Sequence, residues 1–425
     1  MKTIAQISET ATHARGTVLR LTLALSIITY FDRVAISSAS PAIRAALHLT
    51  PIQIGWVFSA FTFAYAAFEI PSGWLGDVIG PRKVIARIVL WWSAFTALTG
   101  TAWNFASLLV MRFLFGVGEA GAFPNMSRSF SSWIPADERG AAHGLIIMGT
   151  RAGGALTPPL MVALMAWLGW RASFFVLGAL GAIWCVFWLK WFRDDPADHP
   201  SVNAAELAEI NRGRATPSVV ESDWRQLLSV RLLLICLMYF CCVYGLSFYL
   251  TWLPLFLRDG RGFTGQQAGL GSGVVLLGGA VGTWIGGRLT DALVRRYGLR
   301  IGRSIGVVAL PVSGLLLLAT AITDNPITTI ALLTLTLGTA DLVMGPAWSL
   351  CHDIGGNRAG VVSAAMNTCG NIGGAISPLV VGYSVQLWHS WTMPFYLTGA
   401  VYIIGGVLTL AIDPKPVSKP RSAAL

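Results

Sequence analysis

Long apolar stretches recur along the whole chain and are separated by short polar or charged segments. Most of them have about 20 residues, enough for a helix to cross a hydrocarbon layer of roughly 30 Å. The pattern predicts an all-α membrane protein with twelve transmembrane helices. The predicted helices cover about residues 17–38, 52–76, 84–101, 105–127, 141–165, 171–192, 230–256, 266–290, 302–322, 328–350, 359–386 and 393–412.

The longest polar segment, about residues 193–229, divides the predicted helices into six and six. It begins near Asp194-Asp195-Pro196, and we expect a solvated linker here. The predicted domains are an N-terminal six-helix bundle over residues 1–192 and a C-terminal six-helix bundle over residues 230–425. Residues 1–20 are polar and the first apolar run is long enough to remain a helix, so we expect no cleavable signal peptide.

Composition supports the membrane assignment, because 54% of the residues are hydrophobic and only 12% are charged. A soluble protein needs about twice that share of charge. The net charge of +10 does not indicate a nucleic-acid partner, since the basic residues lie in short loops and at the ends of the chain. Most of them fall on one side of the predicted helices, which makes the linker and both termini cytoplasmic.

Metal, cofactor and enzyme chemistry find no support in the sequence. The six cysteines lack the spacing of metal ligands, and Cys236, Cys241 and Cys242 lie in one apolar run, as small core residues do. No nucleophile motif or cofactor-binding loop is present, and none of the six histidines has a catalytic setting. We therefore expect neither an enzyme nor a bound cofactor.

The two halves of the chain contain matching segments. Gly-Gly-Ala-Leu-Thr-Pro at 153–158 corresponds to Gly-Gly-Ala-Ile-Ser-Pro at 373–378, and Glu119 corresponds to Asp341 at an offset of 222 residues. With an even number of helices in each half, the two copies have the same orientation, as in parallel-repeat transporters. Such a fold places its substrate between the halves and rocks one half against the other.

A glycine-rich segment at 73–83 contains Asp77 and ends with Arg82 and Lys83. A second copy in the other half contains Asp291, Arg295 and Arg296. It resembles the loop signature of the major facilitators, although Val78 stands where Arg is usual. We expect these residues to gate the cytoplasmic side. The alternative is a capped helix end followed by positive-inside charge.

Ionisable residues inside the predicted helices are the strongest functional signal. Asp32 and Arg33 lie in the first helix, Arg112 and Glu119 in the fourth, and Arg151 in the fifth. Guanidinium groups bind carboxylates through two parallel hydrogen bonds, so three arginines favour an organic anion. The alternative is that the charges form structural ion pairs, such as one between Arg112 and Glu119.

Proton coupling is expected to depend on the two acids, because arginine stays protonated at physiological pH. Burial favours a neutral carboxyl group, while a nearby arginine favours the charged form. Protonation of Asp32 or Glu119 would free an arginine for the substrate, which links anion and proton loading. For Glu69, beside Pro71, we expect a gate or structural role, and Asp341 is open between a cavity role and a structural pair.

The segments Tyr30-Phe31-Asp32-Arg33, Arg112 to Glu119 and 249–254 resemble the anion:cation symporter family of the major facilitators. The resemblance extends over about residues 17–412. Members carry hexonates, hexuronates, glucarate and aromatic acids, or vesicular glutamate and sialic acid. The resemblance implies that Asp32 and Glu119 are the proton-linked pair and that Arg33 and Arg112 bind the anion.

The same resemblance implies that Tyr65 lies near the substrate. In the second half, the candidates for the rest of the site are Tyr244, Trp348, Asn367 and Asn371. The two asparagines are four residues apart and share a helix face, so they could bind hydroxyl groups. Arg151 is a further candidate substrate-binding cation to which the family assigns no role.

We expect a monomeric transporter in the bacterial inner membrane that moves a sugar acid together with protons by alternating access. Its partners are then a small organic anion, protons and the lipid bilayer. Other candidates are a carrier of aromatic or dicarboxylic acids and an organic-phosphate antiporter. From another class, a ligand sensor on the same fold would change conformation without transport.

Overall fold

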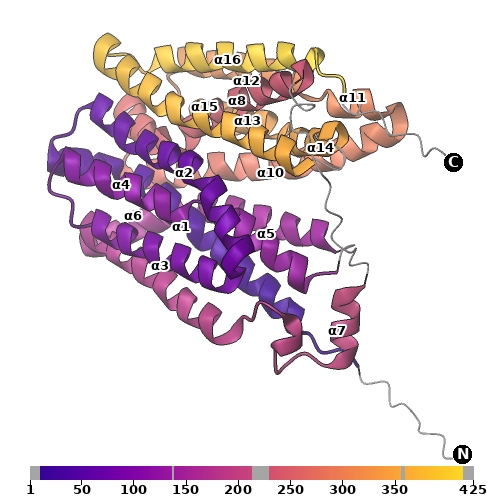
Figure 1. The fold of residues 1–425 in the computed structure, drawn as a ribbon. Helices are drawn as coiled ribbons and strands as arrows, with labels where there is room; N and C mark the ends of the chain where they lie inside the picture. Colours follow the sequence, from indigo (N-terminus) through magenta and orange to yellow (C-terminus); the bar gives the residue numbers. More distant parts are fainter. Residues whose placement is uncertain (1–9, 136–137, 213–228, 356–358, 415–425) are drawn as a thin grey trace, which may run out of the picture.

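The computed structural model describes residues 10–135, 138–212, 229–355 and 359–414, and these contain helices and connecting segments but no strand. The helices form two halves that pack against each other along their length (Figure 1). The helices of the first half are α1 Ala14–Leu47, α2 Pro51–Ile79, α3 Pro81–Thr99, α4 Phe105–Glu119, α5 Ala122–Trp133 and α6 Arg139–Trp191.

The second half follows two short helices, η1 Pro196–Asp198 and α7 Ala204–Asn211. Its elements are α8 Val230–Thr251, α9 Leu253–Leu255, the π-helical turn η3 Phe256–Gly260, α10 Gly265–Tyr297, α11 Leu299–Arg303, α12 Gly306–Ile322, α13 Pro326–Asp341, α14 Met344–Gly355, α15 Ala359–Trp388 and α16 Thr392–Leu410. We call the end of the molecule with α5, α7, α11 and α14 the α7 end (Figure 1). The opposite end, where α8 leads into α9 and η3, is the α9 end.

Local sequence signals explain where several helices begin and turn. Thr50 and Thr264 form capping boxes with Gln53 and Gln267 at the starts of α2 and α10, the corresponding helices of the two halves. Each box satisfies two backbone N–H groups that the first helical turn leaves free. The long element α6 is broken at Gly169, whose φ of 74° and ψ of 167° are not helical and suit glycine, so the two helices predicted here meet at a kink.

The internal repeat is visible as a pair of broken helices. α4 ends at Glu119 and α5 begins three residues later, and α13 ends at Asp341 with α14 beginning three residues later. Gly121 adopts a φ of 86° in the first break, and an added Cβ would lie 2.5 Å from the Ser72 side chain. Each acid therefore lies where a helix is interrupted inside its half.

Eight helices or helix pairs of the described chain are long and apolar enough to cross a membrane. The helices α1, α3 and α15 lie outside this set; α1 contains Asp32 and Arg33, and α15 contains Asn367 and Asn371. Large apolar side chains are exposed around the molecule, including Trp167 at 90% and Ile327 at 81%. A continuous apolar surface of this kind is stable only when another apolar phase covers it.

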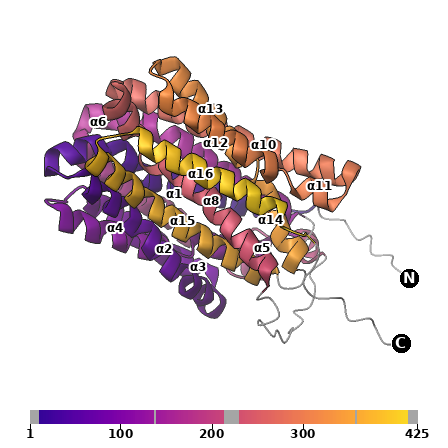
Figure 2. The ribbon, with the colours of Figure 1, turned by 90° about the horizontal axis from the view of Figure 1, so that it is seen from above.

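The two halves join mainly through α2 with α15 and α6 with α10 (Figure 2). Toward the α9 end, the Ser59 hydroxyl donates to the Ala375 carbonyl at 2.6 Å, and Arg44 pairs with Asp259 at 2.7 Å. A Cβ added to Gly55 would lie 2.7 Å from the Pro378 carbonyl oxygen, so the backbones are in close approach there. At the α7 end, α5 and α14 pack chiefly on helices of their own halves.

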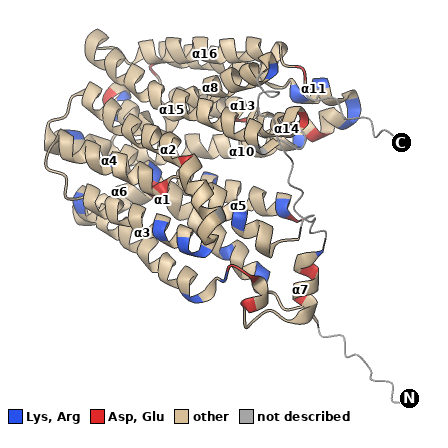
Figure 3. Cartoon of the chain, in the orientation of Figure 1, with Lys and Arg blue, Asp and Glu red and all other residues tan. Residues whose placement is uncertain are grey.

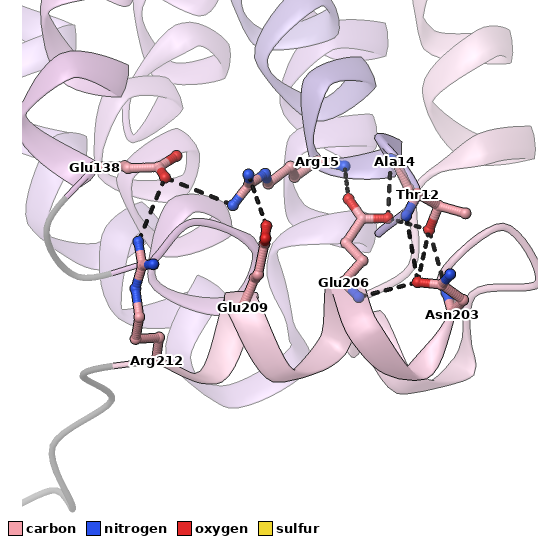
Figure 4. A network of polar contacts seen from close by, with 8 residues as sticks. All are labelled: Thr12, Ala14, Arg15, Glu138, Asn203, Glu206, Glu209 and Arg212. Atoms are coloured by element: carbon pink, nitrogen blue, oxygen red, sulfur yellow. Dashed lines mark hydrogen bonds and ion pairs between the residues drawn. The ribbon is translucent and has the colours of Figure 1, made fainter. Parts of the chain in front are cut away.

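The predicted linker is partly folded, because α7 docks on the first half (Figure 4). The buried Glu206 carboxylate accepts hydrogen bonds from the backbone N–H groups of Ala14 and Arg15 at 3.1 and 2.9 Å, and from the Thr12 hydroxyl. His13 gives α1 no side-chain cap, so an acid from α7 caps α1 instead. A carboxylate at a helix N-terminus also interacts favourably with the helix dipole.

We predict that Glu206→Ala lowers the free energy of unfolding by about 1–2 kcal/mol, as loss of a helix cap does. Amide hydrogen exchange should become faster in the first turn of α1 and in α7. Glu209→Ala is the matched control, because its ion pair with Arg15 at 2.9 Å is partly exposed and should contribute little. Equal exchange rates in both variants would contradict this role for Glu206.

Candidate anion-binding site

Three buried charged residues and the partly exposed Arg33 meet inside the first half. Asp32 and Arg33 come from α1, and Arg112 and Glu119 from α4, with exposures of 1%, 3% and 0% for Asp32, Arg112 and Glu119. Arg33 Nε donates to Glu119 Oε1. The sequence therefore predicted the members of this cluster, but Arg33 and not Arg112 forms the ion pair with Glu119. Arg112 lies about 10 Å from Glu119 along α4, whereas α1 passes beside the end of that helix.

Several polar atoms of this cluster are buried without a hydrogen-bond partner among the described residues. They are Arg112 Nε, Arg33 Nη2, Glu119 Oε2 and both carboxylate oxygens of Asp32. A buried polar group without a partner costs roughly 1–3 kcal/mol, and more when it is charged. The unsatisfied donors on two arginines favour binding of an anion with several acceptor oxygens.

Aromatic rings surround both arginines. The guanidinium carbon of Arg33 lies 4.6 Å from the Tyr65 ring centre and 5.2 Å from that of Phe61. Arg112 lies 5.2 Å from the same Phe61 ring and 4.5 Å from Phe115. These cation–π contacts stabilise the cations without cancelling their charge. Tyr65 thus lies beside the cluster, and Phe61, one helical turn before it, was missed although the four-residue spacing could have indicated it.

The Asp32 carboxyl group faces α3. Trp92 and Thr96 of that helix point toward it, but their indole N–H and hydroxyl groups remain outside hydrogen-bonding geometry. Arg112 is within electrostatic range of both Asp32 and Glu119. Asp32 therefore has polar neighbours without a direct partner, whereas Glu119 is paired with Arg33.

A second ion pair joins the two halves. Arg151 Nη2 of α6 lies 3.1 Å from Asp341 Oδ2 of α13, with side-chain exposures of 16% and 1%. The Thr283 hydroxyl lies 3.5 Å from the same oxygen. Asp341 is thus in a salt bridge, one of the two roles expected for it, and its partner comes from the opposite half.

The two predicted asparagines also reach across the halves. Asn367 Nδ2 donates to both carboxylate oxygens of Glu69 at 3.1 and 3.0 Å, and Asn371 Nδ2 lies 3.5 Å from Oε2. Their shared helix face is therefore directed at α2, where the Glu69 carboxylate accepts hydrogen bonds from both side-chain amides. Glu69 becomes a bridge between α2 and α15, a contact that sequence analysis did not foresee.

The remaining candidates of the second half lie apart from one another. Trp348 Nε1 donates to the Tyr239 hydroxyl at 3.3 Å, and Tyr239 is within electrostatic range of Arg151. Tyr244 is buried and stacks on Phe240 with 6.2 Å between ring centres. No described contact connects Tyr244 to the charged residues. Tyr239, which sequence analysis missed, is joined to Trp348 by the hydrogen bond to its hydroxyl.

The predicted gating residues lie at the α7 end. The Arg82 backbone N–H donates to Asp194 Oδ1 at 2.8 Å, and its guanidinium donates to the Leu189 carbonyl. The side chain of Asp77 lies outside the described part of the structure. Lys83, Asp291 and Arg295 are exposed on α3 and α10. These residues are separate from the anion-binding cluster, and their gating role stays a prediction.

The fold and the site together define a membrane protein with two repeated helical halves, a buried Arg112 and the partly exposed Arg33 and Arg151 at and beside their junction. The chain belongs to the Major Facilitator Superfamily, whose family model matches residues 22–378.

Similar proteins from bacteria carry the names of organic-acid transporters. The chain is 38% identical to the probable sulfoacetate transporter SauU of Cupriavidus necator, with 94% of each chain covered. It is 30% identical to the probable galactarate/D-glucarate transporter GudP of Bacillus subtilis, covering 96% of this chain and 93% of the relative. It is also 30% identical to a D-galactonate transporter of Escherichia coli, covering 90% and 91%.

The fold is similar to a solved structure as well. A bacterial homologue of the human lysosomal transporter Spinster, in an inward-facing and unoccupied conformation, matches with a TM-score of 0.79. The match covers 94% of this chain and 97% of that structure at 17% sequence identity. This likeness supports the two-bundle architecture.

We predict that Arg33→Leu lowers the free energy of unfolding by about 3–5 kcal/mol, because it leaves the buried Glu119 carboxylate without its cation. The double variant Arg33→Leu/Glu119→Leu should regain most of this loss. Thermal unfolding of the purified protein in detergent measures both. Arg44→Leu serves as a control, since its pair with Asp259 is about one-third exposed and should contribute at most about 1 kcal/mol. Additive losses in the double variant would refute a direct pair.

Proposed function

We propose that this protein is a secondary transporter that carries a small organic acid together with protons across the bacterial cytoplasmic membrane. The observation that carries the proposal is the buried cluster in which Arg33 and Arg112 keep unpartnered donors beside Asp32 and Glu119. Ionisable side chains are energetically costly inside a membrane and are found there mainly where they serve a substrate or ion pathway.

The proposed topology has twelve spans. The pairs α4–α5 and α13–α14 each count as one span, α6 counts as two, and α1, α3 and α15 are spans despite their polar residues. Lys and Arg residues gather near α3, α5 and α11 at the α7 end (Figure 3). By the positive-inside rule this end is cytoplasmic, and so are both chain termini.

The substrate carboxylate is proposed to bind Arg112 first, with Arg33 as the second donor. Arg112 has no ion pair within the described residues, so its positive charge is available. The hydrophobic rings of Phe61, Tyr65 and Phe115 exclude water around the two guanidinium groups, which strengthens their attraction for an anion. Tyr244, Trp348, Asn367 and Asn371 remain candidates for the other end of the substrate.

Protons are proposed to enter through Asp32 and Glu119. While Glu119 is ionised, it holds Arg33. When Glu119 takes up a proton, the pair weakens and Arg33 can donate to the substrate carboxylate instead. Binding of the anion and of the proton then favour each other, which is the thermodynamic requirement for symport.

Alternating access follows from where the halves are joined. Direct contacts toward the α9 end, such as Ser59 with Ala375, close that side. Rocking about the centre would break them and bring the cytoplasmic ends together. Asp77, Arg82, Lys83, Asp291 and Arg295 lie in segments at the α7 end and are proposed to control closure there.

A sugar acid is the leading substrate class, because similar transporters are named for galactarate, glucarate, galactonate and hexuronate. The relative named for sulfoacetate adds small sulfonated acids to the compounds worth testing. An organic-phosphate antiporter would not need the acid pair, and a sensor would bind without accumulation. We propose that the transporter acts as a monomer.

We predict that proteoliposomes accumulate at least one of galactonate, glucuronate, glucarate and sulfoacetate under an inward proton gradient. Uptake of labelled compound, with and without the gradient, measures this. The absence of uptake of every carboxylate would refute the proposal, and binding without accumulation would favour the sensor.

In the same assay, Glu119→Gln should abolish accumulation driven by the proton gradient but keep exchange of internal for external substrate. The amide cannot release a proton, so the coupled step is lost while the anion can still cross in both directions. Loss of both activities would indicate that Glu119 has a structural role only.

Arg112→Ala should weaken substrate binding at least tenfold, since one charge-assisted hydrogen bond contributes about 1.5–3 kcal/mol. Equilibrium binding of labelled substrate to the purified protein gives the affinity. Arg20→Ala is the control, because Arg20 is exposed and its hydrogen bonds to described residues lie within the first turns of α1. Unchanged affinity in Arg112→Ala would remove Arg112 from the anion site.

A further inference from the structure

The ion pair between Arg151 and Asp341 connects α6 of the first half with α13 of the second, so it crosses the interface at which the halves would move in alternating access. Its nitrogen and oxygen atoms are 3.1 Å apart, and the Asp341 side chain is 1% exposed. A Cβ added to Gly279 of α10 would lie 2.8 Å from the Asp341 carboxylate, so the acid is tightly enclosed. Separation of the halves here would leave a buried charge without compensation, which is strongly unfavourable.

The repeat makes this pair unusual. Asp341 occupies the position of Glu119, but Glu119 receives its cation, Arg33, from its own half. The position that corresponds to Arg112, at the same offset of 222 residues, is Thr334. Asp341 therefore depends on a cation from the opposite half, and its charge is compensated only while the halves meet at this point.

Arg151 lies next to the proposed anion site. Arg33 lies 5.4 Å from the centre of the Tyr30 ring, and Gly153, two residues after Arg151, packs against the Tyr30 side chain, where an added Cβ would lie 3.1 Å from its Cβ. Gly154 of α6 faces that ring, where an added Cβ would be 3.4 Å away. The Arg151 side chain is 16% exposed, unlike its partner. Tyr30 therefore adjoins both Arg33 of the proposed anion site and the turn of α6 that follows Arg151.

We infer that the Arg151–Asp341 pair is a latch that a second anionic group of the substrate opens. One acidic group binds Arg112 and Arg33, and the other takes the place of Asp341 at Arg151. The displaced Asp341 carboxylate takes up a proton from solvent, which keeps the interior neutral, and Thr283 remains beside it. The inference rests on the proposed transport function and specifies its substrate class, short acids with two anionic groups.

The test compares matched ligands that differ in the second anionic group: galactarate with galactonate, and sulfoacetate with acetate. Affinities are measured on the purified full-length protein by calorimetry. The wild type should bind the dianion of at least one pair about tenfold or more tightly than the monoanion. Arg151→Gln should reduce this ratio about tenfold, because the second group loses its cation.

Asp341→Asn gives the decisive result, because its predicted effect has the opposite sign. Removal of the competing carboxylate should raise the dianion-to-monoanion ratio, whereas a purely structural ion pair would weaken binding in both variants alike. Arg151→Lys keeps a cation, so its dianion-to-monoanion affinity ratio should lie between those of wild type and Arg151→Gln. This variant tests the latch if Asp341→Asn fails to fold. Thermal unfolding of each variant shows whether it is folded.

The outcomes separate this inference from the proposed function. Binding and transport with equal affinity for both members of every pair that binds would overturn the latch and leave organic-acid transport intact. A fall in the ratio for Asp341→Asn would also overturn it. If none of the ligands binds or is transported, the proposed function and the latch both fail.

Discussion

A charge buried in an apolar helical bundle must meet an opposite charge, because the surrounding medium screens it poorly. Two acids of this chain, Glu119 and Asp341, lie at the last residues of interrupted helices. A helix C-terminus is itself unfavourable for negative charge. Each acid therefore requires a cation from another helix, and Arg33 and Arg151 supply it. These two pairs connect α1 with α4 inside one half, and α6 with α13 between the halves.

The other contacts between the halves are of a different kind. Toward the α9 end, hydrogen bonds and close backbone approach at Gly55 hold α2 against α15. The backbone contacts carry no net charge, and the Arg44–Asp259 pair at this end is about one-third exposed, so water can solvate it when the halves part. Asp341 and Glu69, in contrast, lose polar partners from the opposite half. The linker helix α7 is attached through Glu206 to the start of α1, so it belongs mechanically to the first half.

Much of the fold could be predicted from the sequence, because apolar run length and capping residues determine where helices begin and end. The members of the charged cluster were also predictable, since charges within apolar helices are rare. Which of these residues form ion pairs with one another could not be predicted. Arg112 and Glu119 share a helix face and suggested a pair, yet Arg33 of the neighbouring helix reaches Glu119 first. Likewise, the engagement of Asn367 by Glu69 depends on packing between helices almost 300 residues apart in the chain.

The linked binding of anion and proton can be measured directly by isothermal titration calorimetry. The purified protein is titrated with an organic acid that it binds, in two buffers of different ionisation enthalpy, and the binding enthalpies are compared. The proposed mechanism predicts a buffer-dependent enthalpy that corresponds to net uptake of protons on binding near pH 7. The uptake should decrease in Glu119→Gln. Identical binding enthalpies in both buffers, with tight binding retained, would contradict the coupling of the anion to Asp32 and Glu119.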